Sequence, residues 1–248
     1  VMDCAMRSTP SAAAAVSGIV LPATRAPLHM GRRVFLAAMA AGVAGLAVDV
    51  RGAPGLSLMA SAFTDNGFEI YTTSGIPVLS PATFHLALGG LVHHPQILSL
   101  EQLGAMPAVR LVRDYHCVTG WSVPHVAWTG IRLRDLLAMA GPLPAASFAL
   151  FHSADGSYTE SLSLDQANLS DVLLAYKLND QPLSREQGYP LRLVVPEMYG
   201  FKNIKWLDRI TLSEELVLGY WERRGYANDA WLGPRSNYGK EFGPNGQR

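Results

Sequence analysis

The stretch YPLRLVVPEMYGFKNIKWLDRI, residues 189–210, places a charged side chain inside a short apolar strand. Residues 191–195 are apolar except for Arg192 and are closed by Pro196, a pattern typical of a short buried strand. An arginine in such a strand needs a carboxylate or a bound anion as its partner. The stretch therefore predicts a strand within a sheet in which Arg192 binds a carboxylate or an anion.

A glycine turn and two lysines follow this strand. Lys202 and Lys205 come shortly after Gly200. Basic side chains that converge on glycine-containing backbone form an anion site, because side-chain charge and free N–H groups act together. The alternative is a solvated loop with scattered lysines, and Arg192 argues against it. The chain contains no Gly-x-Gly-x-x-Gly or P-loop pattern, so an ordinary nucleotide site is not expected.

The stretch DYHCVTGWSV, residues 114–123, holds Cys117, one of two cysteines in the chain. A buried cysteine is usually a small hydrophobe, but Cys117 lies between an apolar strand and a glycine turn. Its thiolate suits a soft metal. A catalytic cysteine would need a histidine as its base. His116 is expected to point to the opposite face of the strand from Cys117, so the base would have to be a distant residue such as His152. A zinc site is weakly supported, because no Cys-x-x-Cys is present.

Alternation of apolar residues and the placement of turns predict an α+β domain of mixed β-sheets with short helices. Strands are expected at residues 68–72, 84–88, 109–115, 148–152, 158–164, 173–178, 191–195 and 206–212. One helix is expected over residues 131–140, with Gly141 as its stop. A shorter helix should begin at Ser99, with Gln102 as its capping-box partner.

The N-terminal part of the chain has the order of an export signal. In GRRVFLAAMAAGVAGLAVDV, residues 31–50, Arg32 and Arg33 precede an apolar run over residues 34–48. This run is shorter than the ~20 residues that a membrane-spanning helix needs. The Arg-Arg-x-Phe-Leu order resembles the twin-arginine signal, which is read by a receptor that exports folded proteins. We expect residues 1–62 to be an extension and signal, residues 63–248 the folded domain, and the location periplasmic.

Charge is unevenly divided between these two parts. Residues 1–62 hold five arginines and two aspartates, which leaves 15 basic and 18 acidic groups in residues 63–248. A domain with net negative charge binds nucleic acid poorly, because neutralising phosphates drives that affinity. No nucleic-acid partner is expected.

Three motifs occur in an order that resembles the sulfite oxidase family of molybdopterin enzymes. They are DYHCVTGW at residues 114–121, PLRLVVPEMYGFKNIKWL at 190–207 and WERRGY at 221–226. The resemblance covers about residues 68–226. It implies a sulfite-oxidase-like molybdopterin-binding fold, Mo-molybdopterin as the cofactor, and an oxidoreductase that transfers an oxygen atom with two-electron redox. Sulfoxide reduction and sulfite-type oxidation are the two reactions it implies.

The resemblance also assigns roles to individual residues. Cys117 matches the cysteine that gives its thiolate to molybdenum, and Tyr226 matches a tyrosine that reaches the metal site. Arg192 matches the arginine that contacts the pterin phosphate. The remaining cofactor contacts that it implies are Tyr71, Thr72, Thr73, Ser153, Gln187, Asn203, Ile204 and Lys205.

The sequence departs from the family in ways that bear on substrate and partners. Sulfite oxidases carry a substrate-binding arginine in the segment near Tyr71, where this chain has Thr73, so the resemblance favours the sulfoxide-reductase-like members. No Cys-x-x-Cys-His haem motif is present, so a separate electron-transfer partner, a cytochrome or a membrane haem subunit, is expected besides the small-molecule oxo donor or acceptor. We also expect a minimal catalytic domain. Two alternatives stay open at this point: an exported, cofactor-free binding module with the same fold, and a thiol hydrolase that uses Cys117.

Overall fold

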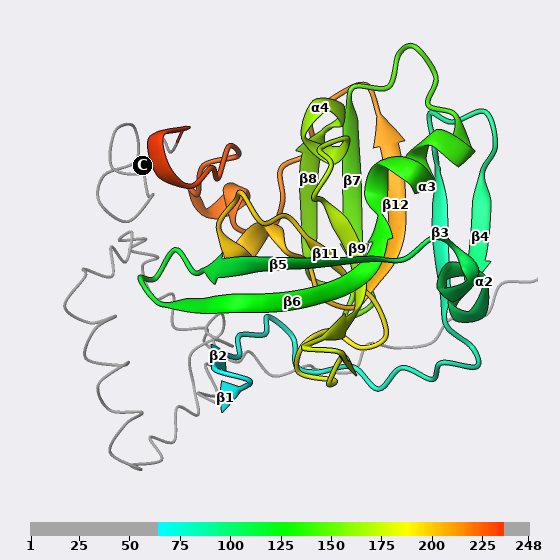
Figure 1. The fold of residues 1–248 in the computed structure, drawn as a ribbon. Helices are drawn as coiled ribbons and strands as arrows, with labels where there is room; N and C mark the ends of the chain where they lie inside the picture. The colour runs from blue at the N-terminus through cyan, green and yellow to red at the C-terminus, as the bar shows by residue number, and fades with distance from the viewer. Residues whose placement is uncertain (1–63, 236–248) are drawn as a thin grey trace, which may run out of the picture. The chain divides into compact units, whose positions relative to one another are not determined.

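The computed structural model describes residues 64–235, so the twin-arginine signal expected within residues 1–62 lies outside the described residues. The described part of the chain forms two five-stranded sheets and one two-stranded ribbon, connected by short helices (Figure 1). The predicted α+β class with mixed sheets is confirmed. Among the described helices, none has both the length and the apolar character that crossing a membrane requires.

The first five-stranded sheet carries the strand that leads to Cys117. All its pairings are antiparallel, in the order β5, β6, β9, with β10 and β11 both pairing with β9. Its members are β5 (Val109–His116), β6 (Ser122–Arg132), β9 (Leu173–Leu178), β10 (Gln181–Pro182) and β11 (Arg192–Val194). The strand that carries Arg192 and the strand that ends beside Cys117 therefore belong to one sheet.

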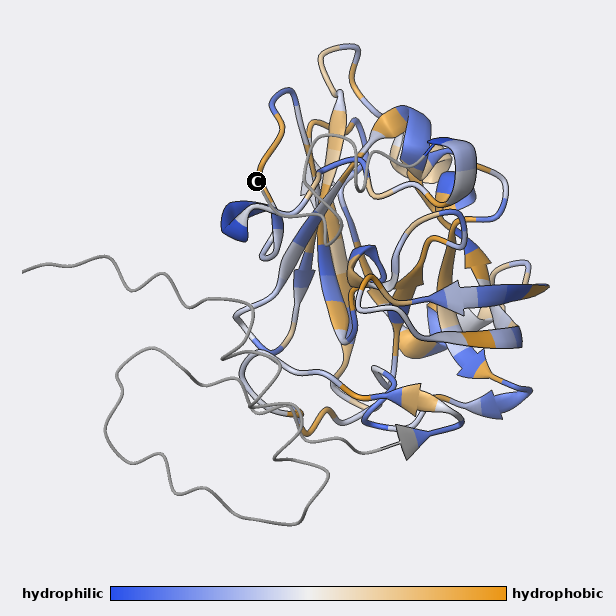
Figure 2. Ribbon diagram, turned by 90° about the vertical axis from the view of Figure 1, so that its left-hand side faces the viewer, coloured by the Kyte–Doolittle hydropathy of each residue, from blue (hydrophilic) through white to orange (hydrophobic). Residues whose placement is uncertain are grey.

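The second five-stranded sheet is mixed. Its order is β4, β3, β12, β7, β8, with β3 and β12 parallel and the other pairs antiparallel. Its members are β3 (His85–Gly90), β4 (Gln96–Ser99), β7 (Phe148–Ser153), β8 (Thr159–Ser163) and β12 (Leu207–Ser213). Buried and partly buried residues alternate along β7, as expected when one face of a strand packs on the core, and Figure 2 shows hydrophobic and hydrophilic residues together in the strands.

The helices are short, and their ends follow local sequence signals. Helix α2 (Leu100–Ala105) has the predicted capping box between Ser99 and Gln102, and α4 (Leu164–Ala167) has a second box that we did not predict. Helix α3 (Leu133–Ala140) ends at Gly141, whose φ of 64° is left-handed. The chain also forms the 3₁₀ turns η1 (Gly200–Lys202), η2 (Glu222–Arg224) and η3 (Gly233–Arg235).

Two expected elements differ from the structure. The helix expected from residue 131 begins at Leu133, because Ile131 and Arg132 still belong to the long strand β6, which we missed. The strand expected over residues 68–72 is regular only in β2 (Phe68–Glu69), which pairs with β1 (Thr64–Asp65). The carbonyl of Tyr71 instead accepts a hydrogen bond from a lysine side chain, so residues 70–72 leave the ribbon.

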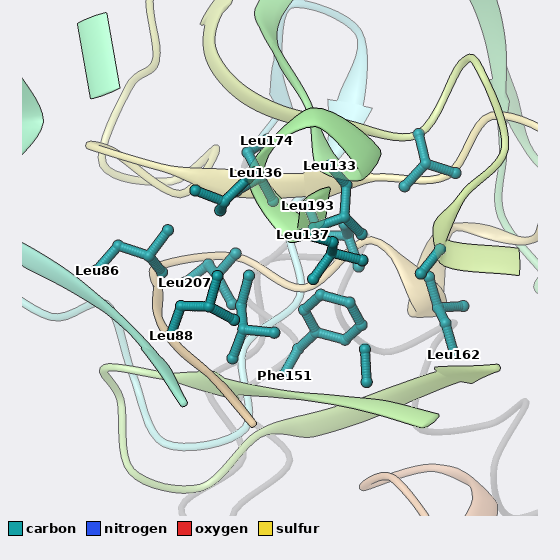
Figure 3. Close-up of a cluster of buried hydrophobic side chains, with 14 of the residues drawn as sticks. Leu86, Leu88, Leu133, Leu136, Leu137, Phe151, Leu162, Leu174, Leu193 and Leu207 are labelled. Atoms are coloured by element: carbon teal, nitrogen blue, oxygen red, sulfur yellow. The ribbon is translucent and has the colours of Figure 1, made fainter. Parts of the chain in front are cut away.

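A leucine-rich core joins both sheets to helix α3. Figure 3 shows Leu133, Leu136 and Leu137 of α3 above Phe151 and beside leucines of both sheets. Burying one leucine side chain contributes about 1.5–3 kcal/mol. A second, smaller cluster contains Phe68, Trp128 and their neighbours, and it lies at the strands that lead to Cys117 and Arg192. This second cluster fixes the backbone from which the site is built.

Candidate active site

Cys117 lies in the tight turn between β5 and β6. The backbone N–H of Cys117 donates to the carbonyl of Trp121 (2.9 Å), and the N–H of Gly120 donates to the carbonyl of Cys117 (3.1 Å). Gly120 has a φ of 106°, a conformation that a side chain would strain. The Cys117 sulfur lies 3.1 Å from the hydroxyl of Thr119. The turn therefore holds the thiol at the end of a rigid strand pair.

A cavity of about 480 Å³ opens beside this thiol. One wall comes from the β5–β6 turn, and the other comes from Tyr199 and from the C-terminal segment of the described residues. The lining residues are His116, Cys117, Val118, Gly120, Ser122, Tyr199, Leu232 and Gly233. Its lining contains no arginine, lysine, aspartate or glutamate among the described residues. The space is large enough for a small molecule and is nearly uncharged.

The cavity corrects one argument about His116. We expected His116 and Cys117 to point to opposite faces, but both line the cavity, because β5 ends at His116 and strand alternation stops there. His116 pairs with Ser122 instead, at 2.8 Å between Nδ1 and Oγ. His152 lies in the other sheet and contacts Arg209 (3.2 Å). Among the described residues, no histidine hydrogen-bonds to the Cys117 sulfur.

Burial raises the pKa of the Cys117 thiol. A catalytic nucleophile needs the opposite shift, since the thiolate is the reactive form. A zinc site would need neighbouring histidines such as His93 and His94, whose ring centroids are 6.2 Å apart. Among the described residues, no three His, Cys, Asp or Glu side chains lie close enough together to hold a metal ion. The geometry therefore argues against the hydrolase and zinc interpretations. It leaves a thiol that can act as a soft ligand once a metal displaces its proton.

Arg192 is buried in β11 without a carboxylate partner among the described residues. Its Nη1 donates to the backbone carbonyl (3.0 Å) and to Oε1 (2.9 Å) of Gln187, and its Nη2 donates to the carbonyl of Asn203 (3.1 Å). Its Nε is buried with no hydrogen-bond partner. Its guanidinium carbon lies 4.9 Å from the ring centroid of Trp128. Dipoles alone hold this charge, so a bound anion would stabilise it.

Lys205 repeats this arrangement. Its Nζ donates to the carbonyls of Tyr71 (2.8 Å) and Glu186 (3.0 Å) and forms no ion pair with a described carboxylate. Burial, with a further contribution from the charge of Arg192, lowers the pKa of Lys205 to about 7, while Asp155 and Glu186 oppose this weakly. A buried cation and a partly buried cation that repel each other form a site that an anion would stabilise.

Lys202 does not belong to this pair, which corrects the expectation that it would help form the anion site. It is fully buried and points away, into an ion cluster with Glu160 and Glu222. The sequence could not separate Lys202 from Lys205, because both follow the same turn. Lys202 ends the 3₁₀ turn η1, and Lys205 follows three residues later, so the two ammonium groups point to different partners.

Tyr71 connects the thiol to the anion site. Its backbone carbonyl holds Lys205, and its hydroxyl donates to Glu69 (2.6 Å). Burial, followed by the hydrogen bond and charge of Glu69 and the charge of Cys117, raises the pKa of Tyr71 to about 12. Its hydroxyl therefore stays protonated near the thiol. The structure thus brings together the segments around Tyr71, Cys117 and Lys205.

The other predicted site residues each have contacts of their own. Asn203 accepts the N–H of Val195 with its side chain, and Ile204 is buried and accepts the N–H of Leu193 with its carbonyl (2.9 Å). The hydroxyls of Thr73 and Ser157 are 2.6 Å apart. Ser153 is buried and accepts the N–H of Asp155 (3.3 Å), and Thr72 is partly buried.

Tyr226 belongs to an aromatic cluster that joins η1 and η2. Its ring packs against Phe201 (centroids 5.5 Å) and Trp221 (5.1 Å). The tyrosine that lines the cavity beside Cys117 is Tyr199, which sequence reasoning did not select. A signal for it was present, because Tyr199 immediately precedes the Gly200 turn that leads to the lysines.

The fold places a thiol at a cavity and two cations without described carboxylate partners in one sheet and its adjoining turn, and comparisons with known proteins identify the family. A family model described as the oxidoreductase molybdopterin binding domain matches residues 73–221. An uncharacterized oxidoreductase of Bacillus subtilis, YuiH, is 39% identical over 171 residues, which cover 68% of this chain and 86% of that protein. The chain belongs to the sulfite oxidase family of molybdopterin-binding oxidoreductases, whose cofactor is Mo-molybdopterin.

Other relatives are longer than this chain. The protein-methionine-sulfoxide reductase catalytic subunit MsrP of Gluconobacter oxydans is 35% identical over 182 residues, which cover 64% of this chain and 58% of that protein. Mitochondrial sulfite oxidase of Drosophila melanogaster is 30% identical over 201 residues, 70% of this chain and 35% of that enzyme. The crystal structure of the sulfane dehydrogenase SoxCD from Paracoccus pantotrophus has the same fold, with a TM-score of 0.60, 24% identity and coverage of 72% and 52% of the two chains.

Proposed function

We propose that this chain is an exported, periplasmic enzyme that transfers an oxygen atom with two-electron redox, and that it works as a sulfoxide reductase rather than as a sulfite oxidase. The observation that carries the proposal is the combination of two features. One is the Cys117 thiol at an open cavity, and the other is the pair of cations, Arg192 and Lys205, that have no described carboxylate partner.

These residues fit the cofactor of the family. Arg192 and Lys205 would hold the phosphate of the pterin by charge-assisted hydrogen bonds, with the free Nε of Arg192 as one donor. Cys117 would give its thiolate to molybdenum as a soft ligand. When bound, the molybdenum centre supplies the oxygen-atom transfer and accepts or donates the two electrons.

The protein's own contribution is to orient and to exclude water. Gln187 and Asn203 fix the guanidinium of Arg192, so that it need not reorganise when the phosphate binds. Thr119 holds the thiol of Cys117 in one direction. Tyr115, whose hydroxyl lies against Gly200, and the carbonyl of Tyr71, which accepts from Lys205, connect these two positions. We assign Tyr226, through its own hydroxyl, the role of a hydrogen-bond or proton donor to the reacting group.

The cavity favours a neutral substrate. Its described lining contains no arginine or lysine that could bind a sulfite dianion, whereas the His116–Ser122 pair offers hydrogen-bonding groups to a neutral sulfoxide oxygen. Leu232 offers an apolar contact for a thioether or methyl group. The absence of an arginine at Thr73 supports the same preference.

Location and partners complete the proposal. The Arg32-Arg33 leader supports export of the folded, cofactor-loaded protein by the twin-arginine route. Electrons would come from a separate cytochrome or membrane haem subunit. The description of a relative as a catalytic subunit is consistent with such a second component.

Steady-state turnover with artificial dyes tests the reaction. Cofactor-loaded protein should reduce methionine sulfoxide with a reduced dye and should oxidise sulfite at least about a hundredfold less efficiently, as a missing charge partner predicts. Efficient sulfite oxidation without sulfoxide reduction would overturn the proposed direction and substrate. A protein with neither activity and no bound metal would support the cofactor-free module instead.

A further inference from the structure

A second set of charges lies beneath the turn that carries Lys205, and neither the cofactor nor the substrate uses it in the account above. The Nζ of Lys202 donates to Oε1 of Glu160 (2.5 Å), to Oε1 of Glu222 (2.9 Å) and to the carbonyl of Ser161 (2.9 Å). The side chains of Lys202 and Glu160 are 0% exposed, and that of Glu222 is 1% exposed. We call Glu160, Lys202 and Glu222 the buried triad.

The buried triad is unbalanced in charge. It contains two carboxyl groups and one ammonium group. The Oε2 atoms of Glu160 and Glu222 are buried and have no hydrogen-bond partner among the described residues. Burial, together with the neighbouring charge of Glu222, raises the pKa of Glu160, although Lys202 opposes the shift. One proton on a carboxyl group makes the triad neutral as a whole, because it then carries one negative and one positive charge.

Among residues 64–235, no other cation forms an ion pair with the triad. The hydroxyl of Tyr158 faces it and donates to the carbonyl of Phe201 (2.6 Å), so this tyrosine is neutral and occupied. Arg223 lies outside the triad, and its Nη2 donates to the hydroxyl of Thr159 (3.3 Å). The backbone at Gly219 closes the remaining side, since a Cβ there would lie 2.4 Å from Oε2 of Glu222.

The three members come from three separate segments. Glu160 lies in β8, Lys202 ends η1, and Glu222 begins η2. The chain runs from η1 directly into Asn203 and Lys205, and from η2 directly into Tyr226. Breaking the triad would therefore release both the anion-site turn and the tyrosine segment from the sheet that supports them.

We propose that Glu160, Lys202 and Glu222 act as positioning residues, a proton-dependent clamp that holds the anion-site turn and the Trp221–Tyr226 segment against β8. With the proton bound, the triad is neutral and closed. Loss of the proton places a net negative charge in the interior, which weakens the clamp. The clamp rests on the proposed function only in the part that concerns cofactor binding.

The sign of the pH effect follows from proton linkage. The pKa of Glu160 rises from its ordinary value of 4.5 to about 8 in the fold. Between these values the folded protein binds more protons than the unfolded chain, so stability falls as pH rises through this window. The clamp should be fully closed at the acid end of the window and should loosen as pH passes about 8.

Trypsin cleavage of the full chain directly measures how readily the clamp opens. Arg223 and Arg224 are exposed in η2, and Lys177 is an exposed reference site in β9. We expect the ratio of cleavage at the two arginines to cleavage at Lys177 to rise about tenfold between about pH 6.5 and 9, because local opening precedes cleavage. The ratio cancels the pH dependence of trypsin itself.

Two variants and a control separate the clamp from general stability. Glu160→Gln keeps the size of the side chain and leaves a neutral pair, so the cleavage ratio should stay low and flat across pH. Lys202→Met leaves two carboxyls without their cation and should give about tenfold faster cleavage at neutral pH and less bound molybdenum. Glu214→Gln alters an exposed carboxyl nearby and should match the wild type.

The outcomes are distinguishable from failure of the proposed function. A pH-independent ratio in the wild type, or an unchanged profile in Glu160→Gln, overturns the clamp even when Lys202→Met does not fold. Equal molybdenum contents in the wild type and a folded Lys202→Met overturn its role in cofactor binding. Wild-type protein without molybdenum would overturn the proposed function, while the cleavage ratio would still decide whether the clamp exists.

Discussion

The hydroxyl of Tyr115 fills the space that a side chain on residue 200 would need: a Cβ built on Gly200 would lie 2.0 Å from the Tyr115 hydroxyl oxygen. Tyr115 is two residues before Cys117, and Gly200 begins the turn that leads to Lys205. The tyrosine ring also stacks on Trp121, with centroids 5.6 Å apart. This contact joins the turn that carries Cys117 to the turn that leads to Lys205.

The first prediction follows from this contact. Gly200→Ala should displace the Tyr115 hydroxyl and destabilise the protein by about 1–3 kcal/mol, as overpacking does. Because both halves of the site shift, molybdenum content should fall more than the stability loss alone explains. Gly104→Ala is the matched control, since nothing lies within 4 Å of a Cβ at this position in α2. Thermal unfolding and metal analysis of both variants check the prediction, and equal metal contents would contradict it.

Arg192 gives the second prediction. Arg192→Lys keeps the charge but cannot reproduce the bonds to both Gln187 and Asn203, so the cofactor should be retained at least about tenfold less well. The measurement is pterin and molybdenum content after gel filtration. Arg110→Lys, in an exposed pair with Asp180, is the control and should keep full content. Full retention by Arg192→Lys would show that this guanidinium does not hold the phosphate.

Lys205 gives a pH-dependent prediction for the cofactor-free protein. Its pKa falls from 10.5 to about 7 in the fold, so between these values the folded state binds fewer protons than the unfolded chain, and stability rises with pH in this window. An anion stabilises the charged form. Sulfate should therefore raise the unfolding temperature more at a pH below about 7 than above it.

Lys205→Met serves as the comparison for that experiment. Sulfate stabilises most proteins to some degree through exclusion from their surface, and this general effect should remain in the variant. The pH-dependent part should vanish. An identical pH profile in the wild type and in Lys205→Met would remove Lys205 from the anion site.

Much of this fold could be predicted from local signals. The capping box at Ser99, the glycine stop at Gly141 and the recurrence of apolar residues in β12 each depend on neighbouring residues alone. Strand β6 could not be read in the same way, because Pro124 and His125, which has a φ of 54°, interrupt its pattern. Its strand character comes from pairing with β5 and β9, which are distant in sequence.

The site shows the same division. Cys117 and Arg192 were predictable because each is an exception to its local composition. The separate destinations of Lys202 and Lys205 were not predictable, because they depend on Glu160 and Glu222, which are 42 and 20 residues away from Lys202. The roles of Tyr115 and Tyr199 also depend on long-range contacts that an aromatic residue in a strand or turn does not reveal.

Cys117→Ser tests the metal ligand. Serine has nearly the same size, and the hydroxyl can keep the contact with Thr119, so the unfolding temperature should change little. Turnover should be lost, because a hard alkoxide replaces the soft thiolate. The measurement pairs dye-linked activity with the visible absorption of the thiolate-bound metal. A Cys117→Ser protein with full activity and an unchanged spectrum would contradict the assignment.

The most direct test of the account is metal analysis of the wild-type protein after expression in a host that makes the molybdenum cofactor. We predict stoichiometric molybdenum and pterin in the purified protein, and loss of both when Arg192 and Lys205 are replaced together. Wild-type protein that folds and contains no molybdenum would contradict the claim that Cys117 and these two cations form a cofactor site.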